Sequence, residues 1–310
     1  MWGTIGIVAI GAWGLSHLKA AYRERAAKAA FPPEGDFVEV DGTRVHYVTR
    51  GTGPDVVLIH GMSGNLRDMT FSLMDRLAER YRVTAFDRPG MGYTARTSKA
   101  GETLTEQAHL LAKASAKLGL VEPILMGQSY GGSVALAWGV HNPDHIGGLV
   151  LTASPSHPWD GGMSLLYRIN SHPLLAHIAI PFESAWVSHR YIDKAIAGVF
   201  APQPMPKGYN AHLGAALTIR RSALRANAMH RAGLLAQIQH LVPLYDQLTM
   251  PIEIIHGTAD QTVPAEIHTT PLAARLPNAH VTLLDGIGHM PHHCSEDAVL
   301  KAVDRVHQRK

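Results

Sequence analysis

Cysteine is almost absent from this chain of 310 residues. The single cysteine, Cys294, excludes an intramolecular disulfide and any C-x-x-C metal or redox pair, and it says nothing decisive about the redox compartment. The sequence also lacks an H-E-x-x-H zinc motif and an internal repeat. We therefore expect neither a metal nor a cofactor.

Charge is also sparse. Charged residues make up 17% of the chain, the net charge is only +3, and no long run of Lys and Arg occurs. This pattern argues against a nucleic-acid partner. With 46% hydrophobic residues the chain can bury a large core, and its length fits one α/β domain with an insertion.

The N-terminus has a composition of its own. No formal charge occurs from Trp2 to Leu18, and Lys19, Arg23, Arg25 and Lys28 follow. These 17 residues reach the lower limit for crossing a bilayer at about 1.5 Å per residue. Because the positive charge follows the apolar stretch, an uncleaved anchor with a cytoplasmic basic segment is favoured over a secretory signal peptide. A helix packed on the protein's own surface is the third alternative.

Residues 1–30 are therefore predicted as an apolar anchor and a basic helical stalk, which Pro32 and Pro33 end. The main domain would then be membrane-associated and cytoplasmic. If the stretch is instead a cleaved signal, the mature protein is secreted or periplasmic.

Period-two patterns begin after the prolines. Residues 37–48 read as an antiparallel hairpin. Apolar strand patterns then alternate with helical ones, which predicts a mostly parallel sheet flanked by helices. The strand patterns cover residues 55–60, 83–86, 123–127, 148–152, 251–255 and 280–284, and the helical ones 66–80, 103–118 and 130–140.

The segment from Gly127 to Gly131 reads Gly-Gln-Ser-Tyr-Gly, directly after a strand pattern and before a helical one. This is the G-x-S-x-G nucleophile elbow, in which Ser129 takes a strained backbone conformation. Glycines must flank the serine so that strand and helix can pass closely.

Two further turns follow strands in the same region, His60-Gly61 and Asp87-x-Pro89-Gly90-x-Gly92. With the elbow, they resemble the landmarks of the α/β-hydrolase superfamily in that superfamily's order. The resemblance covers the chain from Phe37 to the C-terminus, apart from a middle insertion. It implies an α/β-hydrolase core made of residues 31–154 and 251–310, with a helical cap over 155–250.

The resemblance also implies a catalytic triad in the order serine, acid, histidine. Asp260 stands in a loop after a strand and resembles the acid, and His289 stands behind Gly-x-Gly and resembles the histidine. Asp87 is the competing acid, but it precedes Ser129, so we interpret it as bracing its own turn. We interpret the other nearby polar residues as structural, with Cys294 as a small buried residue: His60, His256, His268, His292, His293 and Cys294.

An acyl-transfer serine also needs hydrogen-bond donors for the developing oxyanion. By resemblance these are the backbone N–H groups of Met62 and Tyr130. A shift of one residue, from Met62 to Ser63, stays open.

The insertion shows helical spacing with prolines between some segments. Its apolar residues are candidates for an acyl pocket or for packing: Trp159, Met163, Phe182, Trp186, Phe200 and Met205. Its eight Lys and Arg residues against four acids favour a solvated helix face over a site for an anionic substrate.

The function implied is a serine hydrolase that cleaves a carboxylic ester of a small molecule, with a hydrophobic or lipid-like ester as one candidate. Ser129 argues against haloalkane dehalogenases and epoxide hydrolases, which place aspartate there. Carbon–carbon bond hydrolases and cofactor-free haloperoxidases share the triad and stay open. From another class, a non-catalytic binding or accessory protein on the same fold is the alternative.

Overall fold

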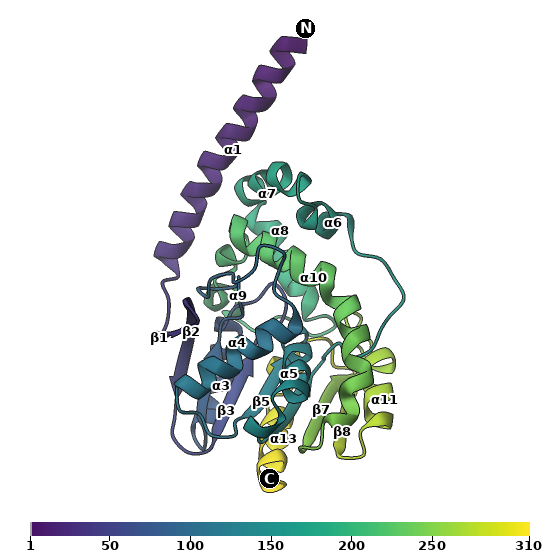
Figure 1. The fold of residues 1–310 in the computed structure, drawn as a ribbon. Coiled ribbons are helices and arrows are strands. Elements are labelled where there is room, and N and C mark those ends of the chain that lie inside the picture. Colours follow the sequence, from purple (N-terminus) through teal and green to yellow (C-terminus); the bar gives the residue numbers. More distant parts are fainter. Residues whose placement is uncertain (1) are drawn as a thin grey trace.

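The computed structural model describes the backbone of residues 2–310 and the side chains of residue 7 and residues 10–310. Within these residues, eight strands form one sheet in the order β1-β2-β4-β3-β5-β6-β7-β8 (Figure 1). The strands are β1 (Asp36–Val40), β2 (Thr43–Arg50), β3 (Asp55–Ile59), β4 (Arg82–Phe86), β5 (Ile124–Gln128), β6 (Gly148–Thr152), β7 (Ile252–Gly257) and β8 (Ala279–Leu284).

The sheet is parallel from β4 to β8, and only β2 pairs in antiparallel fashion, with β1 and β4. The predicted hairpin and the mostly parallel sheet are thus confirmed. Because parallel strands end at one edge of a sheet, the loops after β3, β5, β7 and β8 meet there, at the usual ligand-binding edge of an open α/β sheet.

Helices cover both faces of the sheet (Figure 1). Apolar residues of α4, α5 and α11 share one buried cluster with the strands, and those of α3 and α13 share another. The helices of the core are α2 (Arg67–Thr70), α3 (Leu73–Ala78), α4 (Leu104–Lys117), α5 (Tyr130–His141), α11 (Ala265–Arg275), α12 (Pro291–Cys294) and α13 (Glu296–Gln308).

The central strands contribute side chains to both clusters, the one with α5 and the one with α13, because successive side chains of a strand point to opposite faces. In β3, Val57 and Ile59 lie in the α5 cluster, whereas Val56 and Leu58 lie in the α13 cluster. This explains why the strands read as continuous apolar runs.

The single helix predicted for residues 66–80 is wrong. Two short helices, α2 and α3, stand there, and Ser72 between them has a non-helical backbone. Tertiary contacts hold the break: the Ser72 hydroxyl donates to Glu296 Oε2, and the Phe71 ring meets the Tyr209 ring edge to face. The local sequence pattern cannot reveal these partners, because they lie more than a hundred residues away in the chain.

Between β6 and β7 the chain forms five helices and two short 3₁₀ turns. The helices are α6 (Leu165–Ser171), α7 (Leu175–Trp186), α8 (His189–Val199), α9 (Tyr209–Leu213) and α10 (Arg221–Leu241), and the turns are Ala215–Leu217 and Val242–Gln247. A third 3₁₀ turn, Pro143–His145, precedes β6. The helical insertion is therefore as predicted, and its separation as a cap domain with the bounds 155–250 stays a prediction.

One proline of the insertion, Pro181, lies inside α7 and not between two helices. A proline cannot donate to the carbonyl four residues earlier. That carbonyl, of His177, instead accepts a hydrogen bond from the indole N–H of Trp13 at 3.1 Å. The N-terminal helix thus satisfies the acceptor that Pro181 leaves free.

Residues 2–30 form one continuous helix, α1 (Trp2–Ala30), which covers both the predicted anchor and the predicted stalk. No helix in the described part of the chain is long and apolar enough to cross a membrane. The predicted anchor therefore gains no support, although the side chains of residues 2–6, 8 and 9 lie outside the described residues.

The second half of α1 packs on the protein. Ser16 and Ala20 are fully buried, and the Ser16 hydroxyl accepts a hydrogen bond from the indole of Trp186 in α7. Arg23 donates to two carbonyls at the end of α7, and Glu24 binds Arg221 of α10. Beyond these contacts α1 projects away from the body (Figure 1).

Candidate active site

Ser129 stands in the turn between β5 and α5, with φ at 49° and ψ at −122°. This positive φ is costly for a residue with a side chain, and the surrounding packing must impose it. A Cβ at Gly127, Gly131 or Gly132 would overlap the backbone or side chain of the neighbouring segments. The structure confirms that the glycines make the room the elbow needs.

The three predicted triad residues meet at the carboxyl edge of the sheet. Ser129 Oγ lies 3.0 Å from His289 Nε2, and His289 Nδ1 lies 2.7 Å from Asp260 Oδ2. All three are nearly buried. The structure thus brings together residues that the sequence separates by 131 and 29 positions.

Asp260 is held ionised by its partners. Burial alone would raise the pKa of the Asp260 carboxyl, but hydrogen bonds from His256 and His289 outweigh it and lower this pKa from its ordinary value. Oδ1 also accepts hydrogen bonds from the backbone N–H groups of Thr262 and Val263. A charged carboxylate in this position orients the His289 ring.

Met62 and Tyr130, the predicted oxyanion donors, both line the cavity that contains Ser129. Tyr130 begins α5, so its N–H has no acceptor in the preceding helical turn. The Ser63 N–H is engaged, because it donates to Asn227 Oδ1 at 2.9 Å. This contact favours Met62 over Ser63 as the second donor.

Asn227 is a residue that sequence reasoning missed. It lies in α10 and makes a two-point contact with Ser63, since its Nδ2 also donates to Ser63 Oγ at 2.8 Å. The insertion therefore braces the turn that carries Met62. No local signal marks this role, which depends on a contact across 164 positions.

His60 and Arg88 also hold the turn that carries Met62. The His60 Nε2 accepts the N–H of Arg88, and its Nδ1 faces the carbonyl of Gly61. Burial, and then the charge of Arg88, lower the pKa of His60 to about 4. The Arg88 guanidinium donates to the carbonyls of His60 and Gly61 and lies over the Tyr130 ring. His60 braces the turn as expected, whereas Arg88 was missed.

Asp87 braces its own surroundings, as interpreted from its place in the chain. It accepts hydrogen bonds from the N–H groups of Leu66 and Tyr93, and its carboxylate contacts His46. It makes no hydrogen bond to His289.

Cys294 was predicted to be buried but is only half-buried, because it lies at the margin of the apolar cluster around Phe200.

A cavity of about 430 Å³ opens onto Ser129, and most of its lining surface is apolar. Of the six apolar candidates in the insertion, Trp159 and Phe200 line it; Trp186 instead packs against α1. Further lining residues of the insertion were not foreseen, because helical patterns do not reveal which face covers the site: Tyr167, Ile196, Val199, Tyr209, Leu213, Arg231 and Leu234.

Comparison with known proteins identifies the family. The sequence model of the alpha/beta hydrolase family matches residues 56–302, so the chain belongs to that family.

Haloalkane dehalogenase 2 of Mycobacterium tuberculosis (strain ATCC 25618 / H37Rv) is 26% identical over 289 residues, which cover 88% of this chain and 94% of the dehalogenase. Pimeloyl-[acyl-carrier protein] methyl ester esterase of Vibrio vulnificus (strain YJ016) is 26% identical over 265 residues, covering 80% of this chain and 92% of the esterase.

Among solved structures, a membrane phospholipase A described as a novel bacterial virulence factor superposes with a TM-score of 0.66 at 22% identity. The match covers 99% of this chain and 98% of the phospholipase. At this identity the likeness shows the fold alone. Together, the family and its relatives make this chain a hydrolase of the α/β fold.

Proposed function

We propose that this hydrolase cleaves a carboxylic ester through an acyl-enzyme, with Ser129 as nucleophile, His289 as general base and acid, and Asp260 as the acid that orients His289. The observation that carries the proposal is the hydrogen-bonded series Ser129–His289–Asp260, with distances of 3.0 Å and 2.7 Å, at the wall of an apolar cavity.

In the first half-reaction, Ser129 Oγ attacks the ester carbonyl while His289 Nε2 takes the hydroxyl proton. The N–H groups of Met62 and Tyr130 donate to the oxyanion that forms. His289 then gives its proton to the leaving alkoxy oxygen, and an alcohol departs. In the second half-reaction a water repeats these steps on the acyl-enzyme, which releases the acid and restores Ser129.

The cavity supports an apolar acyl or alcohol group. Aliphatic and aromatic side chains dominate its lining, and burying them against a substrate contributes about 25 cal/mol per Å² of apolar surface. Ser129 at the nucleophile position argues against the dehalogenase chemistry of one relative. The relative that hydrolyses a methyl ester supports ester cleavage here.

The test is labelling by a fluorophosphonate, followed by kinetics on p-nitrophenyl esters of increasing chain length. Wild-type protein should be labelled and should turn over longer esters with higher kcat/KM. Ser129→Ala should lose both properties at an unchanged melting temperature, since the elbow depends on its glycines.

A wild type that is not labelled would favour the binding-protein alternative. Labelling without ester turnover, but with turnover of a diketone or a peroxy substrate, would favour the carbon–carbon hydrolase or haloperoxidase.

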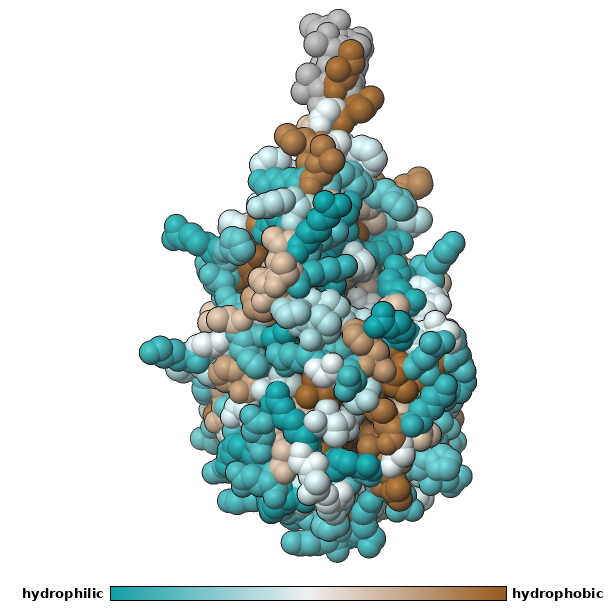
Figure 2. All heavy atoms as spheres, turned by 90° about the vertical axis from the view of Figure 1, so that its left-hand side faces the viewer, coloured by the Kyte–Doolittle hydropathy of each residue, from teal (hydrophilic) through white to brown (hydrophobic). Residues whose placement is uncertain are grey.

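We also propose that the protein associates with a lipid surface through the exposed apolar side chains of α1 and of the neighbouring start of α7. Ile7, Ile10 and Leu18 of α1 and Leu174 and Ile178 at α7 are all more than half exposed. Figure 2 shows apolar side chains along the projecting part of α1. Water disfavours such a surface, and the interfacial region of a bilayer would cover it without a span.

Vesicle flotation checks this association. Full-length protein should float with phosphatidylglycerol and phosphatidylcholine vesicles in high salt, because apolar burial is not screened. The double variant Ile10→Glu, Leu18→Glu should abolish flotation. Val121→Glu, which changes an exposed apolar residue on the surface of the α/β-hydrolase part of the chain, should not. Absence of flotation in the wild type would refute the association and leave the ester hydrolase untouched.

A further inference from the structure

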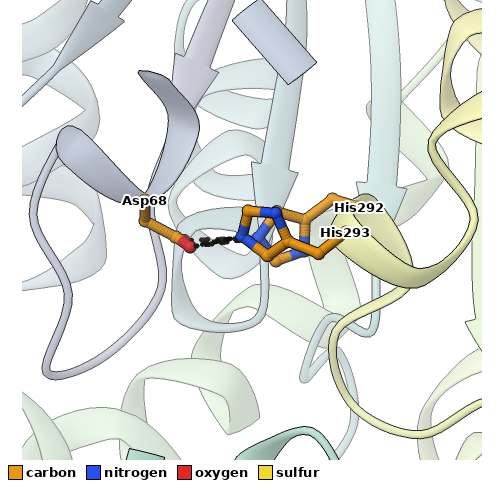
Figure 3. Close-up of side chains that lie close together, drawn as sticks. All are labelled: Asp68, His292 and His293. Carbon is orange, nitrogen blue, oxygen red and sulfur yellow. Dashed lines mark hydrogen bonds and ion pairs between the residues drawn. The ribbon is translucent and has the colours of Figure 1, made fainter. Parts of the chain in front are cut away.

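A second cluster of polar side chains lies beside the catalytic cavity. Asp68 of α2 faces His292 and His293 of α12, and both rings point their Nε2 atoms at its carboxylate (Figure 3). The three side chains are almost completely buried. The mechanism proposed above uses none of them.

The spacing of these atoms suits a metal ion. His293 Nε2 lies 2.8 Å from Asp68 Oδ1, and His292 Nε2 lies 3.3 Å from each oxygen of the carboxylate. A tetrahedral Zn²⁺ with ligands at about 2.0–2.1 Å holds neighbouring ligand atoms about 3.3 Å apart. All three ligand atoms lie within 4.8 Å of one another, so one ion could contact all three once the 2.8 Å hydrogen bond gives way to the wider ligand spacing.

The charge of the cluster also calls for a cation. Buried carboxylates in proteins are paired with a cation or coordinate a metal. In the part of the chain that the structure describes, Asp68 makes ion-pair contacts only with the two imidazoles, and no Lys or Arg reaches it. Its remaining partner is the Tyr209 hydroxyl, which donates to Oδ1 at 2.6 Å.

An ion can reach the cluster from the catalytic cavity. Asp68 lines that cavity together with Tyr209 and Ser129. The Tyr209 hydroxyl, which contacts Asp68 on this side, is the candidate for a fourth ligand.

We propose that Asp68, His292 and His293 form a binding site for a divalent transition-metal ion of the Zn²⁺ class. Two imidazole nitrogens with one carboxylate oxygen are ligands that suit zinc, whereas Mg²⁺ and Ca²⁺ prefer oxygen ligands alone. The ion joins α2 to α12, which begins two residues after His289. It therefore stabilises the loop that carries the catalytic histidine.

The experiment is metal binding by the full-length protein after removal of metals with a chelator. Zn²⁺ is added, excess ion is removed by desalting, and the metal retained per chain is measured together with the melting temperature. One Zn²⁺ should be retained per chain with a rise in melting temperature, and Mg²⁺ should give neither. Co²⁺ should add the visible absorption of a low-symmetry nitrogen and oxygen site.

His293→Gln and Asp68→Asn should each weaken Zn²⁺ binding by more than about 100-fold. Loss of a direct ligand costs more than loss of a residue that hydrogen-bonds a ligand, which costs about 10- to 100-fold in metal affinity. His240→Gln, which removes an exposed histidine of α10, is the matched control and should retain the ion.

Wild-type protein without stoichiometric Zn²⁺ and without the Co²⁺ absorption would overturn the site. Retention of the ion by both cluster variants would also overturn it. If Asp68→Asn does not fold, the Co²⁺ spectrum of the wild type and the behaviour of His293→Gln still decide the matter.

Discussion

At the scale of single residues, the chain contains two buried aspartates that follow strands of the sheet, and their contacts give them different roles. Asp260 contacts His289 Nδ1 and the N–H groups of its own loop. Asp87 contacts His46 and the N–H groups of Leu66 and Tyr93. The contacts of Asp260 orient the His289 ring, whereas those of Asp87 hold the backbone around its own turn.

Asp260→Asn should lower kcat for ester hydrolysis by about 10⁴-fold, the loss that follows when the triad acid of a serine protease becomes an amide. The amide no longer selects the tautomer that leaves His289 Nε2 free to accept the Ser129 proton. Steady-state kinetics on the best p-nitrophenyl ester measures this effect.

Asp87→Asn is the matched control. It should keep kcat within about tenfold of the wild type and lower the melting temperature, because a buried acceptor is weakened. If Asp87→Asn, and not Asp260→Asn, removes turnover while the triad geometry stays intact, the acid has been misassigned.

At the scale of elements, α1 behaves as part of the folded body over its second half. Its small residues allow close contact with α7 and α10, and its polar residues find specific partners there. Ala20 is fully buried, whereas Ala26, less than two turns further along the same helix, is exposed. The same substitution at these two positions therefore tests the packing with two variants of identical composition.

Ala20→Glu should destabilise the protein by at least about 2 kcal/mol, because the variant buries a carboxylate without a partner. Ala26→Glu adds the same charge to the same helix on its exposed face and should change stability by less than about 0.5 kcal/mol. Urea unfolding of both variants measures the difference. Equal midpoints for the two variants would contradict the packing of α1.

At the scale of the whole molecule, buried neutral histidines connect stability to pH. Burial lowers the pKa of both His60 and His268 to about 4 from an ordinary value of 6.5. Between these values the unfolded chain binds the proton and the folded chain does not, so stability falls as the pH is lowered from 6.5 to about 4. Protonation of His60 would also turn the Nε2 that accepts the Arg88 N–H into a donor.

The free energy of unfolding should therefore be lower at pH 5 than at pH 7, with His60 contributing on the order of 2 kcal/mol. Urea unfolding at the two pH values checks this. His60→Asn should be less stable at pH 7 but show a smaller decrease between pH 7 and pH 5. His240→Gln should keep the wild-type decrease, and an equal decrease in His60→Asn would exclude His60 as a source.

The sequence by itself determined the order of the core elements, the elbow and the triad residues. The element order and the elbow depend on short-range signals: apolar runs of strand length and glycines where a Cβ cannot fit. Ser129 stands in the elbow motif, whereas Asp260 and His289 were assigned through the resemblance to the α/β-hydrolase superfamily and the chain order that it implies. A parallel sheet collects the ends of their strands at one edge, which is where the three residues lie.

Only the tertiary structure decided which partners distant segments find. The break at Ser72, the contact of Trp13 with the carbonyl freed by Pro181, the support of Ser63 by Asn227 and the meeting of Asp68 with His292 and His293 join residues more than 100 positions apart. Helical periodicity shows that a face is apolar and not what it packs against. The apolar start of α1 suggested an anchor because its sequence does not show that the second half of the same helix packs against α7 and α10.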